Sequence, residues 1–258
     1  MQGMQIRFDN RTVLITGAAT GIGKATAKAF AAAGAAVVIG DVDPRADGTA
    51  SEIVAAGGRA VFQKTDVTDS GQVQALVARA VSEFGSLDVA FNNAGLLPPT
   101  APLAEQTEAD WHRIIAVDVT GVFLCLKHEL AHMAKVGRGA IVNTASAAGE
   151  HGGAAGVVYT MSKHACVGLT RNTAWYYAKK GIRCNAMIVG GVNTNIMASV
   201  DPSKINAAGA QQAGIYGGII PNFLQPMDVA NLALFLASDE SSMVNGANIA
   251  VDGGWGAA

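Results

Sequence analysis

Short runs of β-branched apolar residues alternate along this chain with longer, alanine-rich amphipathic stretches. This alternation is typical of repeated strand–helix–strand units, which build a parallel sheet that is covered on both faces. The apolar runs predict seven strands, at residues 12–16, 36–41, 59–64, 87–92, 139–144, 182–188 and 248–251. The stretches between them predict helices at about residues 22–33, 45–57, 69–84, 107–136, 156–180 and 227–237.

The length of the chain suits one fold of this kind. Its 258 residues, half of them hydrophobic, can bury one sizeable core, and no repeat or low-complexity linker divides them. We therefore expect a single α/β domain over residues 1–258. Its predicted architecture is a Rossmann-type, doubly wound, parallel seven-stranded sheet with helices on both faces.

The overall charge is close to neutral. A formal net charge of -2 and a pI near 6.2 give no electrostatic footprint for nucleic acid or an anionic membrane, so we expect neither partner. The segment Met1–Asn10 lacks an apolar signal-peptide core, and no other apolar stretch is long enough to span a bilayer. We expect a soluble cytoplasmic protein.

The three cysteines, Cys125, Cys166 and Cys184, are odd in number and each stands in apolar sequence. This pattern suggests neither a disulfide framework nor a metal site, so no metal is expected. His164 lies two residues before Cys166, where a helix would point the two side chains apart. We interpret the cysteines as small buried hydrophobic residues.

A glycine-rich segment, Thr16-Gly-Ala-Ala-Thr-Gly-Ile-Gly23, follows the first predicted strand and begins the first predicted helix. Its glycines let the backbone turn tightly and approach a pyrophosphate, and the helix N-terminus supplies free N–H groups. The spacing G-x-x-x-G-x-G is weakly specific by itself. Its place between a strand and a helix predicts a dinucleotide-binding loop.

Asp41 ends the second predicted strand, where a carboxylate can accept hydrogen bonds from the adenosine ribose hydroxyls. The same charge would repel a 2′-phosphate, which favours NAD over NADP. Lys24 and Arg45 lie close in sequence and leave NADP as the less favoured alternative. A helix-capping or loop acid is the other interpretation of Asp41.

Tyr159 and Lys163 stand four residues apart in a predicted helix, so the ammonium can lie near the phenol and favour its deprotonation. Ser146 follows the strand at 139–144 and could add a hydroxyl to form a proton-transfer site. The alternative is that Tyr159 is a packed aromatic, Lys163 a solvated charge and Ser146 a cap. The spacing alone does not decide between them.

Further motifs stand in order along the chain: Asp66-Val67, Asn92-Asn-Ala-Gly95 and Val251-Asp-Gly-Gly254. With the glycine-rich segment, Ser146 and Tyr159-x-x-x-Lys163, they make the chain resemble the short-chain dehydrogenase/reductase family over essentially its full length. The resemblance implies an NAD(H)-dependent oxidoreductase that interconverts a secondary alcohol and a ketone by hydride transfer.

The resemblance also assigns roles to residues. Tyr159 would be the acid/base, Ser146 would hold the substrate oxygen, and Lys163 would contact the nicotinamide ribose and lower the pKa of Tyr159. The implied cofactor contacts are Gly17, Thr20, Gly21, Ile22, Gly23, Asp41, Asp66, Val67, Asn93, Ala94, Gly95, Tyr159, Lys163, Val192 and Thr194.

Two positions depart from the family pattern. Asp118 stands where the family usually has an asparagine, whose backbone carbonyl holds a water that leads to the lysine. We expect this relay to persist in the catalytic site, with a raised Tyr159 pKa, because a carboxylate close to Lys163 would favour the ammonium and partly offset its effect on Tyr159. Val189 replaces a proline before Gly190, which predicts a more mobile start to the segment that follows.

That segment, about residues 192–225, is rich in glycine, has no clear period, and predicts a substrate-binding loop. Its many apolar side chains and few charges suit a neutral, rather apolar alcohol or ketone. Glu150 and His151, in the turn after Ser146, could touch the substrate. The alternative for the segment 192–225 is a tolerated surface insertion, and the alternative for the turn that carries Glu150 and His151 is an exposed turn without a function.

Two other functions remain open. A 3-oxoacyl thioester reductase is the nearest enzyme, although such reductases usually use NADPH, which Asp41 disfavours. A non-catalytic nucleotide-binding regulator would account for Asp118 and Val189. Family resemblance further implies a homotetramer, in which the helices at 107–136 and 156–180 pair across one interface and the C-terminal region, including the apolar tail 253–258, across another.

Overall fold

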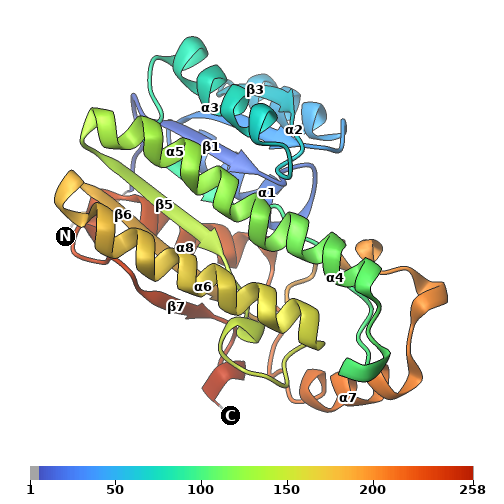
Figure 1. Ribbon diagram of the computed structural model, residues 1–258. Coiled ribbons are helices and arrows are strands. Elements are labelled where there is room, and N and C mark those ends of the chain that lie inside the picture. Colours follow the sequence, from blue (N-terminus) through green and yellow to red (C-terminus); the bar gives the residue numbers. More distant parts are fainter. Residues whose placement is uncertain (1–5, 258) are drawn as a thin grey trace.

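The seven predicted strands form one parallel sheet in the computed structural model, which describes residues 6–257 (Figure 1). The strand order is β3-β2-β1-β4-β5-β6-β7, and every neighbouring pair is parallel. The strands are β1 (Thr12–Thr16), β2 (Ala36–Asp41), β3 (Arg59–Lys64), β4 (Val89–Asn92), β5 (Gly139–Thr144), β6 (Ile182–Val189) and β7 (Asn248–Val251). The predicted fold is confirmed.

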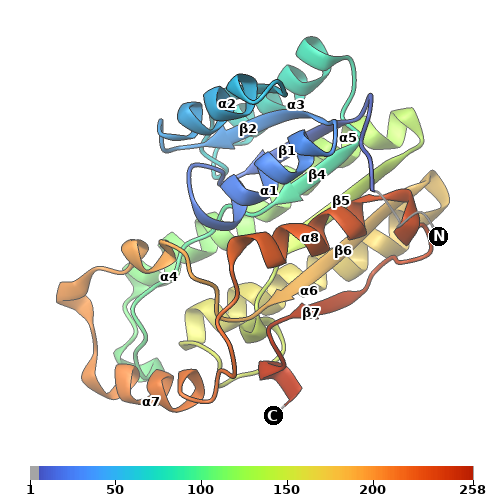
Figure 2. The ribbon, with the colours of Figure 1, turned by 180° about the vertical axis from the view of Figure 1, so that it is seen from behind.

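Helices cover both faces of this sheet. The helices are α1 (Gly21–Ala32), α2 (Ala46–Ala55), α3 (Ser70–Phe84), α4 (Glu108–Ile114), α5 (Val122–Val136), α6 (Val157–Tyr177), α7 (Ala207–Gly217) and α8 (Pro226–Ala237). Figure 1 shows α3, α5 and α6 in front of the sheet, and Figure 2 shows α1, α2 and α8 in front of the other face. Between residues 6 and 257, no helix has both the length and the apolar character to cross a bilayer.

Alternate strand residues supply the two cores between these layers. In β1, Val13 and Ile15 pack with α1 and α8, whereas Leu14 packs on the opposite face with α3 and α5. All five residues of β1 are buried. Because both sides of a central strand are covered, the strands show continuous apolar runs instead of a polar–apolar alternation.

The predicted helix at 107–136 is interrupted. Between α4 and α5 the chain forms a π-helical segment, Ile115–Gly121. A π-helix has wider turns than an α-helix, and the spacing of apolar residues in the sequence does not distinguish the two. Gly121 lies there against Val67, since a Cβ at Gly121 would stand 2.7 Å from the Val67 Cγ2. β4 also begins at Val89, two residues after the predicted start.

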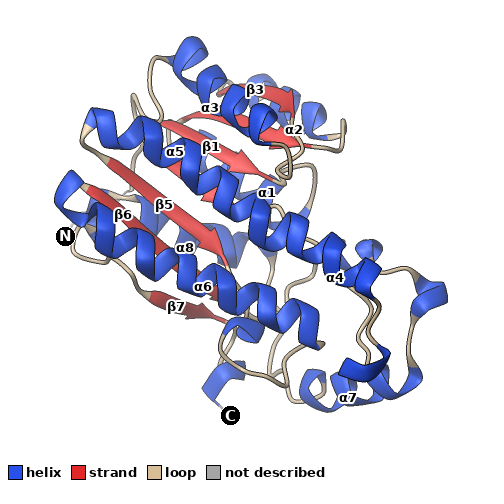
Figure 3. Cartoon of the chain, in the orientation of Figure 1, coloured by secondary structure: helices blue, strands red, loops and turns tan. Residues whose placement is uncertain are grey.

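The segment 192–225 is more ordered than its sequence suggested. It contains the short 3-10 turns Ile196–Ser199 and Pro202–Lys204, and then α7. The Asn206 side chain caps α7 by accepting a hydrogen bond from the Gly209 N–H at 2.9 Å. Figure 3 shows α7 held by long loops beyond the end of the sheet toward which the strand arrows point.

Candidate functional site

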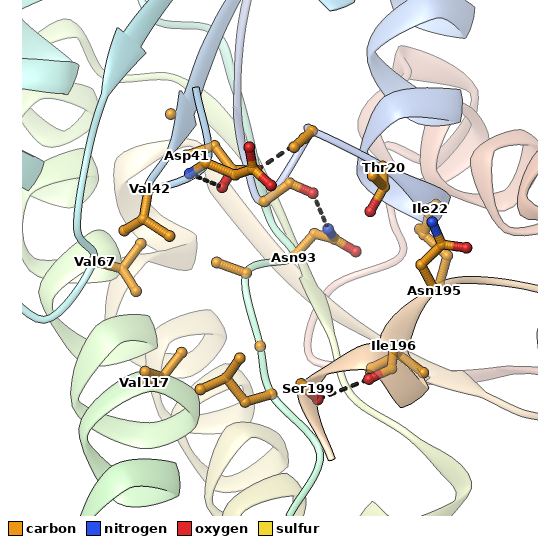
Figure 4. A pocket seen from close by; sticks show the side chains of 18 of the residues that line it. Thr20, Ile22, Asp41, Val42, Val67, Asn93, Val117, Asn195, Ile196 and Ser199 are labelled. Atoms are coloured by element: carbon orange, nitrogen blue, oxygen red, sulfur yellow. Dashed lines mark hydrogen bonds between the residues drawn. The ribbon is translucent and has the colours of Figure 1, made fainter. Parts of the chain in front are cut away.

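A cavity of about 540 Å³ opens beside the carboxyl ends of β1, β2 and β4 (Figure 4). β1 lies between β2 and β4, so the chain reverses its winding there, and such a switch point leaves a crevice between the loops. Eleven predicted site residues line the cavity: Gly17, Thr20, Gly21, Ile22, Asp41, Asp66, Val67, Asn93, Ala94, Gly95 and Thr194.

The glycine-rich loop leaves no room for side chains at two of its positions. Gly17 has φ +71°, and a Cβ there would stand 2.8 Å from the Ala94 Cα. A Cβ at Gly23 would stand 2.0 Å from the Gly17 carbonyl oxygen. Gly23 therefore packs the loop from behind and does not line the cavity. The Asn93 amide donates to the same Gly17 oxygen at 2.9 Å and ties β4 to the loop.

The N-terminus of α1 meets this cavity. Thr20 is the N-cap residue in an extended conformation, and its side chain makes no capping hydrogen bond. The cavity wall includes Thr20, Gly21 and Ile22, so the partly positive end of α1 lies at its edge. These features fit the pyrophosphate of a dinucleotide.

Asp41 lines the cavity and also orders its wall. One carboxylate oxygen accepts a hydrogen bond from the Ala19 N–H at 2.8 Å, and the other accepts one from the Asp43 N–H at 2.9 Å. The interpretation of Asp41 as a loop acid is thus correct, because both of its carboxylate oxygens accept hydrogen bonds from loop N–H groups. Since each carboxylate oxygen can accept more than one hydrogen bond, Asp41 retains capacity for a ligand. Arg45 lines the same end and donates from its Nε to Asp43 at 2.8 Å.

The Tyr159–Lys163 pair is buried on α6, with the two residues 9% and 4% exposed. The Lys163 Nζ lies 5.2 Å from the centroid of the Tyr159 ring and donates to the Thr144 carbonyl oxygen at 3.3 Å. Ser146, just after β5, accepts a hydrogen bond from the Ala148 N–H at 3.2 Å. The interpretation of Lys163 as a solvated charge is therefore wrong.

Burial raises the pKa of the Tyr159 phenol, and several neighbours modify that pKa. The Lys163 ammonium lowers it, the Asp118 carboxylate raises it, and a hydrogen bond with Ser146 lowers it. Burial alone would lower the pKa of Lys163, but the charges of Tyr159 and Asp118 outweigh burial and raise it. The lysine is therefore positively charged at neutral pH.

Asp118 lies in the π-helical segment, fully buried, with its Oδ2 3.2 Å from the Lys163 Nζ. Its Oδ1 accepts a hydrogen bond from the Leu96 N–H at 2.9 Å. Burial raises the pKa of Asp118, and Lys163 and the Leu96 N–H partly offset this increase. The expectation that the carboxylate lies close to Lys163 agrees with this geometry.

Gly95 connects this buried group to the cavity that it lines. A Cβ at Gly95 would stand 3.2 Å from the Asp118 Oδ2 and 3.4 Å from the Lys163 Nζ. At this place, Gly95 thus separates the cavity from the buried Asp118 and Lys163 side chains. The fold brings the glycine-rich loop and the Tyr159–Lys163 pair, which are far apart in sequence, to the two sides of Gly95.

Some predicted residues lie elsewhere. Val192 does not line the cavity; it forms an isolated bridge with Leu224. Glu150 accepts a hydrogen bond from the Asn248 amide at 2.8 Å, so its carboxylate faces β7. The His151 ring centroid lies 6.3 Å from that of Tyr216, on α7.

Val189 lies inside the sheet, just before the segment 192–225. It is the last residue of β6, is buried, and pairs in register with Val251 of β7. The valine replaces the proline inside the sheet, where a regular strand continues. The mobility expected of the segment after it stays a prediction.

Sequence reasoning missed several residues of the cavity wall. They are Ala19, Gly40, Val42, Asp43, Arg45, Thr65, Thr68, Leu96, Val117, Asn195, Ile196, Ala198 and Ser199. Most of them are neighbours of predicted residues on the same loops, and this closeness in sequence could have identified them. Val117 is different, since it reaches the wall through the π-helical segment.

Comparison with known proteins identifies relatives along nearly the whole chain. A family model described as enoyl-(acyl carrier protein) reductase matches residues 17–256. Cis-4-hydroxycyclohexanecarboxylate dehydrogenase from Sinomonas cyclohexanicum is 47% identical over 248 residues, which are 96% of this chain and 97% of that protein. Cyclohexanol dehydrogenase from Acinetobacter sp. (strain SE19) is 38% identical over 253 residues, 98% of this chain and 97% of that protein.

The fold has close structural counterparts as well. The crystal structure of levodione reductase matches with a TM-score of 0.88 at 35% sequence identity, covering 98% of this chain and 100% of that chain.

Proposed function

This chain belongs to the short-chain dehydrogenase/reductase family of alcohol and ketone oxidoreductases, and from that premise we propose that it uses NAD(H) on a neutral, fairly apolar secondary alcohol or ketone. The observation that carries the proposal is the position of Gly95. This glycine lines the cavity suited to a dinucleotide and lies against the buried Lys163 and Asp118. A proton-handling group and a nucleotide site therefore meet at one point.

Nicotinamide dinucleotide, when bound, supplies the hydride acceptor or donor. In alcohol oxidation, Tyr159 as phenolate removes the hydroxyl proton, and in ketone reduction the phenol returns it. Ser146 donates a hydrogen bond to the substrate oxygen as charge develops there. The buried Lys163 ammonium stabilises the phenolate, which a phenol with a pKa near 10 needs at neutral pH.

We assign the cofactor contacts by their place on the wall. The glycine-rich loop with the N-terminus of α1 would hold the pyrophosphate, and Asp41 the adenosine ribose. Asp66 and Val67 would flank the adenine, residues 93–95 would lie beside the nicotinamide half with Lys163, and Thr194 would meet the carboxamide. Val192 would act through its backbone.

Asp41 sets the expected choice of cofactor. Asp41→Asn keeps an acceptor for the Ala19 N–H but removes the negative charge that a 2′-phosphate would meet. We expect the preference for NAD over NADP in kcat/KM to fall by about tenfold, since close like charges cost at least the ~1.4 kcal/mol that tenfold represents. Asp47→Asn removes an exposed charge outside the cavity wall and is the matched control. Equal ratios in both variants would contradict the role of Asp41.

The names of the relatives favour a ring substrate. Two of them are named as dehydrogenases of cyclohexane-ring alcohols, one of which, cis-4-hydroxycyclohexanecarboxylate, also carries a carboxylate. Apolar side chains of the segment 192–225, including Ile196 of the cavity wall, suit the ring of such a substrate. The test is a panel of cyclic and open-chain secondary alcohols, their ketones and a 3-oxoacyl thioester, run with NAD(H) and NADP(H) in parallel and followed at 340 nm. Turnover confined to the thioester would favour a 3-oxoacyl thioester reductase. The absence of turnover with every compound would favour the non-catalytic nucleotide-binding regulator.

Asp118 is expected to move the pH dependence of alcohol oxidation. Its negative charge raises the pKa of Tyr159, so Asp118→Asn should lower that pKa. Because oxidation needs the phenolate, the rise of kcat/KM with pH should occur at lower pH in the variant. Asp110→Asn removes another buried carboxylate, one paired with Arg113 on α4, and should leave the profile in place. An unmoved profile in Asp118→Asn would contradict the coupling.

We also propose that the chain forms a homotetramer, as its family implies. The outer side of α6 exposes Trp175 and Tyr176, and α5 exposes Phe123, which gives apolar surface to the helices expected to pair. Sedimentation equilibrium should yield four times the chain mass of 26.3 kDa. The mass of a single chain would contradict this assembly. The cytoplasmic location stays a prediction of the sequence.

A further inference from the structure

Ser199 ends the 3-10 turn Ile196–Ser199 and lines the cofactor cavity from the side of the segment 192–225. Its hydroxyl accepts a hydrogen bond from the Leu97 N–H at 2.9 Å. The same hydroxyl can donate to the Leu97 carbonyl oxygen at 3.2 Å or to the Ile196 carbonyl oxygen at 2.7 Å, the second of which is drawn in Figure 4. One side chain thus joins the substrate loop to the peptide of Leu97, across 102 residues of sequence.

The peptide that receives Ser199 is held on its other side. Leu96 donates its N–H to the Asp118 Oδ1 at 2.9 Å, and the Asp118 Oδ2 lies 3.2 Å from the Lys163 Nζ. A continuous series of contacts therefore runs from Ser199 through Leu97 and Leu96 to Asp118 and Lys163. Its inner end lies in the core, where Asp118 is fully buried.

The segment that carries Ser199 lies across the mouth of the glycine-rich loop. A Cβ at Gly21 would stand 3.2 Å from the Thr194 Cγ2, and residues 194–196 and 198–199 all line the cavity. Figure 4 shows the ribbon that carries Ile196 and Ser199 facing Thr20 and Asn93 across the cavity. A dinucleotide in this cavity would lie between that segment and the sheet.

Other contacts of the substrate loop lie away from the cavity wall. The Asn206 amide donates to the exposed Glu105 carboxylate at 2.7 Å, and the Trp255 indole donates to the Tyr216 carbonyl oxygen at 3.1 Å. Both hold the region of α7 and neither includes a residue of the wall. Of these anchors, Ser199 is the one placed to control the part of the loop over the cofactor.

We propose that Ser199 is a positioning residue that fastens the substrate loop across the cofactor cavity, and that Asp118 holds its anchor, the Leu96–Leu97 peptide, beside Lys163. The inference rests on the proposed function of the cavity as a nucleotide site. It follows that the loop opens by releasing Ser199 from Leu97 while Asp118, Leu96 and Lys163 stay in place. Nucleotide can then leave without disturbing the proton-handling group.

The first test needs no nucleotide. Amide hydrogen exchange is measured on the free protein and its Ser199→Ala variant. The Leu97 amide and residues 194–200 should exchange faster in the variant, by about fivefold for the loss of one hydrogen bond. Ser203→Ala is the matched control, since the Ser203 hydroxyl donates to the Asp201 carboxylate within the same loop, at 2.7 Å. Ser199→Thr keeps the hydroxyl and should restore slow exchange.

The second test measures NADH binding by fluorescence, together with KM for NAD and kcat. Ser199→Ala should raise the NADH dissociation constant and KM by about fivefold, with no loss of kcat, whereas Ser203→Ala should change neither. Exchange and binding in Ser199→Ala that equal those of Ser203→Ala would overturn the proposal. Faster exchange in a protein whose native form binds neither NADH nor NADPH would support the fastening and refute the proposed function, so the two failures are distinct.

Discussion

Replacing Tyr159 by phenylalanine is expected to lower kcat for alcohol oxidation by about 10²- to 10⁴-fold, the usual contribution of a positioned acid or base. The variant keeps the buried ring 5.2 Å from Lys163 and loses only the hydroxyl that moves the proton. NADH binding should change little, because the residues proposed to hold the pyrophosphate and the adenosine lie at the carboxyl ends of β1, β2 and β3 and at the start of α1, and Tyr159 is not one of them. Stopped assays at 340 nm and NADH fluorescence measure the two effects separately.

Tyr177→Phe is the matched control for this variant. Tyr177 ends the same helix, α6, and has the Nζ of Lys180 5.1 Å from its ring centroid, a pairing much like that of Tyr159 and Lys163. Tyr177 lies at the opposite end of α6 from Tyr159, so the Tyr177→Phe variant should keep full activity. Equal kcat values in Tyr159→Phe and Tyr177→Phe would contradict the proposed chemistry and favour the nucleotide-binding regulator.

Glu129→Gln is expected to remove most of a pH-dependent loss of stability. Glu129, on α5, is fully buried, and its Oε2 accepts a hydrogen bond from the Asn92 amide at 3.1 Å. Its Oε1 has no hydrogen-bond partner among residues 6–257. Burial raises the pKa of this carboxyl from 4.5 to about 7, while the Asn92 hydrogen bond lowers it in part. The folded protein therefore prefers the protonated, neutral form.

The sign of the effect follows from proton binding. Between pH 4.5 and about 7 the folded state holds a proton on Glu129 that the unfolded state has lost, so the free energy of unfolding decreases as pH rises. The full difference between these pKa values corresponds to about 3 kcal/mol, reached above pH 7. Glutamine resembles the neutral acid and cannot ionise, so this part of the pH dependence should disappear.

Urea unfolding between pH 5 and 8 checks this prediction. The native protein should lose stability over the range, and Glu129→Gln should not, which leaves the variant relatively more stable at pH 8. Glu240→Gln alters an exposed glutamate and should retain the native slope. Parallel slopes for the native protein and Glu129→Gln would show that the carboxyl ionises freely or is reached by water.

The local features of the site were predictable because they depend on residues close in sequence. The glycines of residues 17–23 need only a strand before them and a helix after them to form a turn. Tyr159 and Lys163 share a helix face at their spacing of four residues. The predicted ends of the seven strands lie within two residues of the observed ends. The prediction succeeds because a buried parallel strand has an uninterrupted run of apolar residues.

Other features could not be predicted because they depend on long-range packing. The π-helical segment at Ile115–Gly121 brings Asp118 to Lys163, and an apolar period cannot distinguish its wider turns from an α-helix. The helix α7 has too weak an apolar pattern to be recognised in the sequence. Val189 suggested mobility as an isolated substitution, but its pairing with Val251 places it inside the sheet.

The sequence by itself determined the order of strands and helices, the family of the chain and the spacing of Tyr159 and Lys163, because these depend on local period and on motifs that need few neighbours. Only the tertiary structure decided that Gly95 separates the cavity from Lys163 and Asp118, that Ser199 reaches Leu97, and that Glu129 is buried against the Asn92 amide. These contacts join residues tens of positions apart. Their distances are set by how the helices pack on the sheet, which no local pattern records.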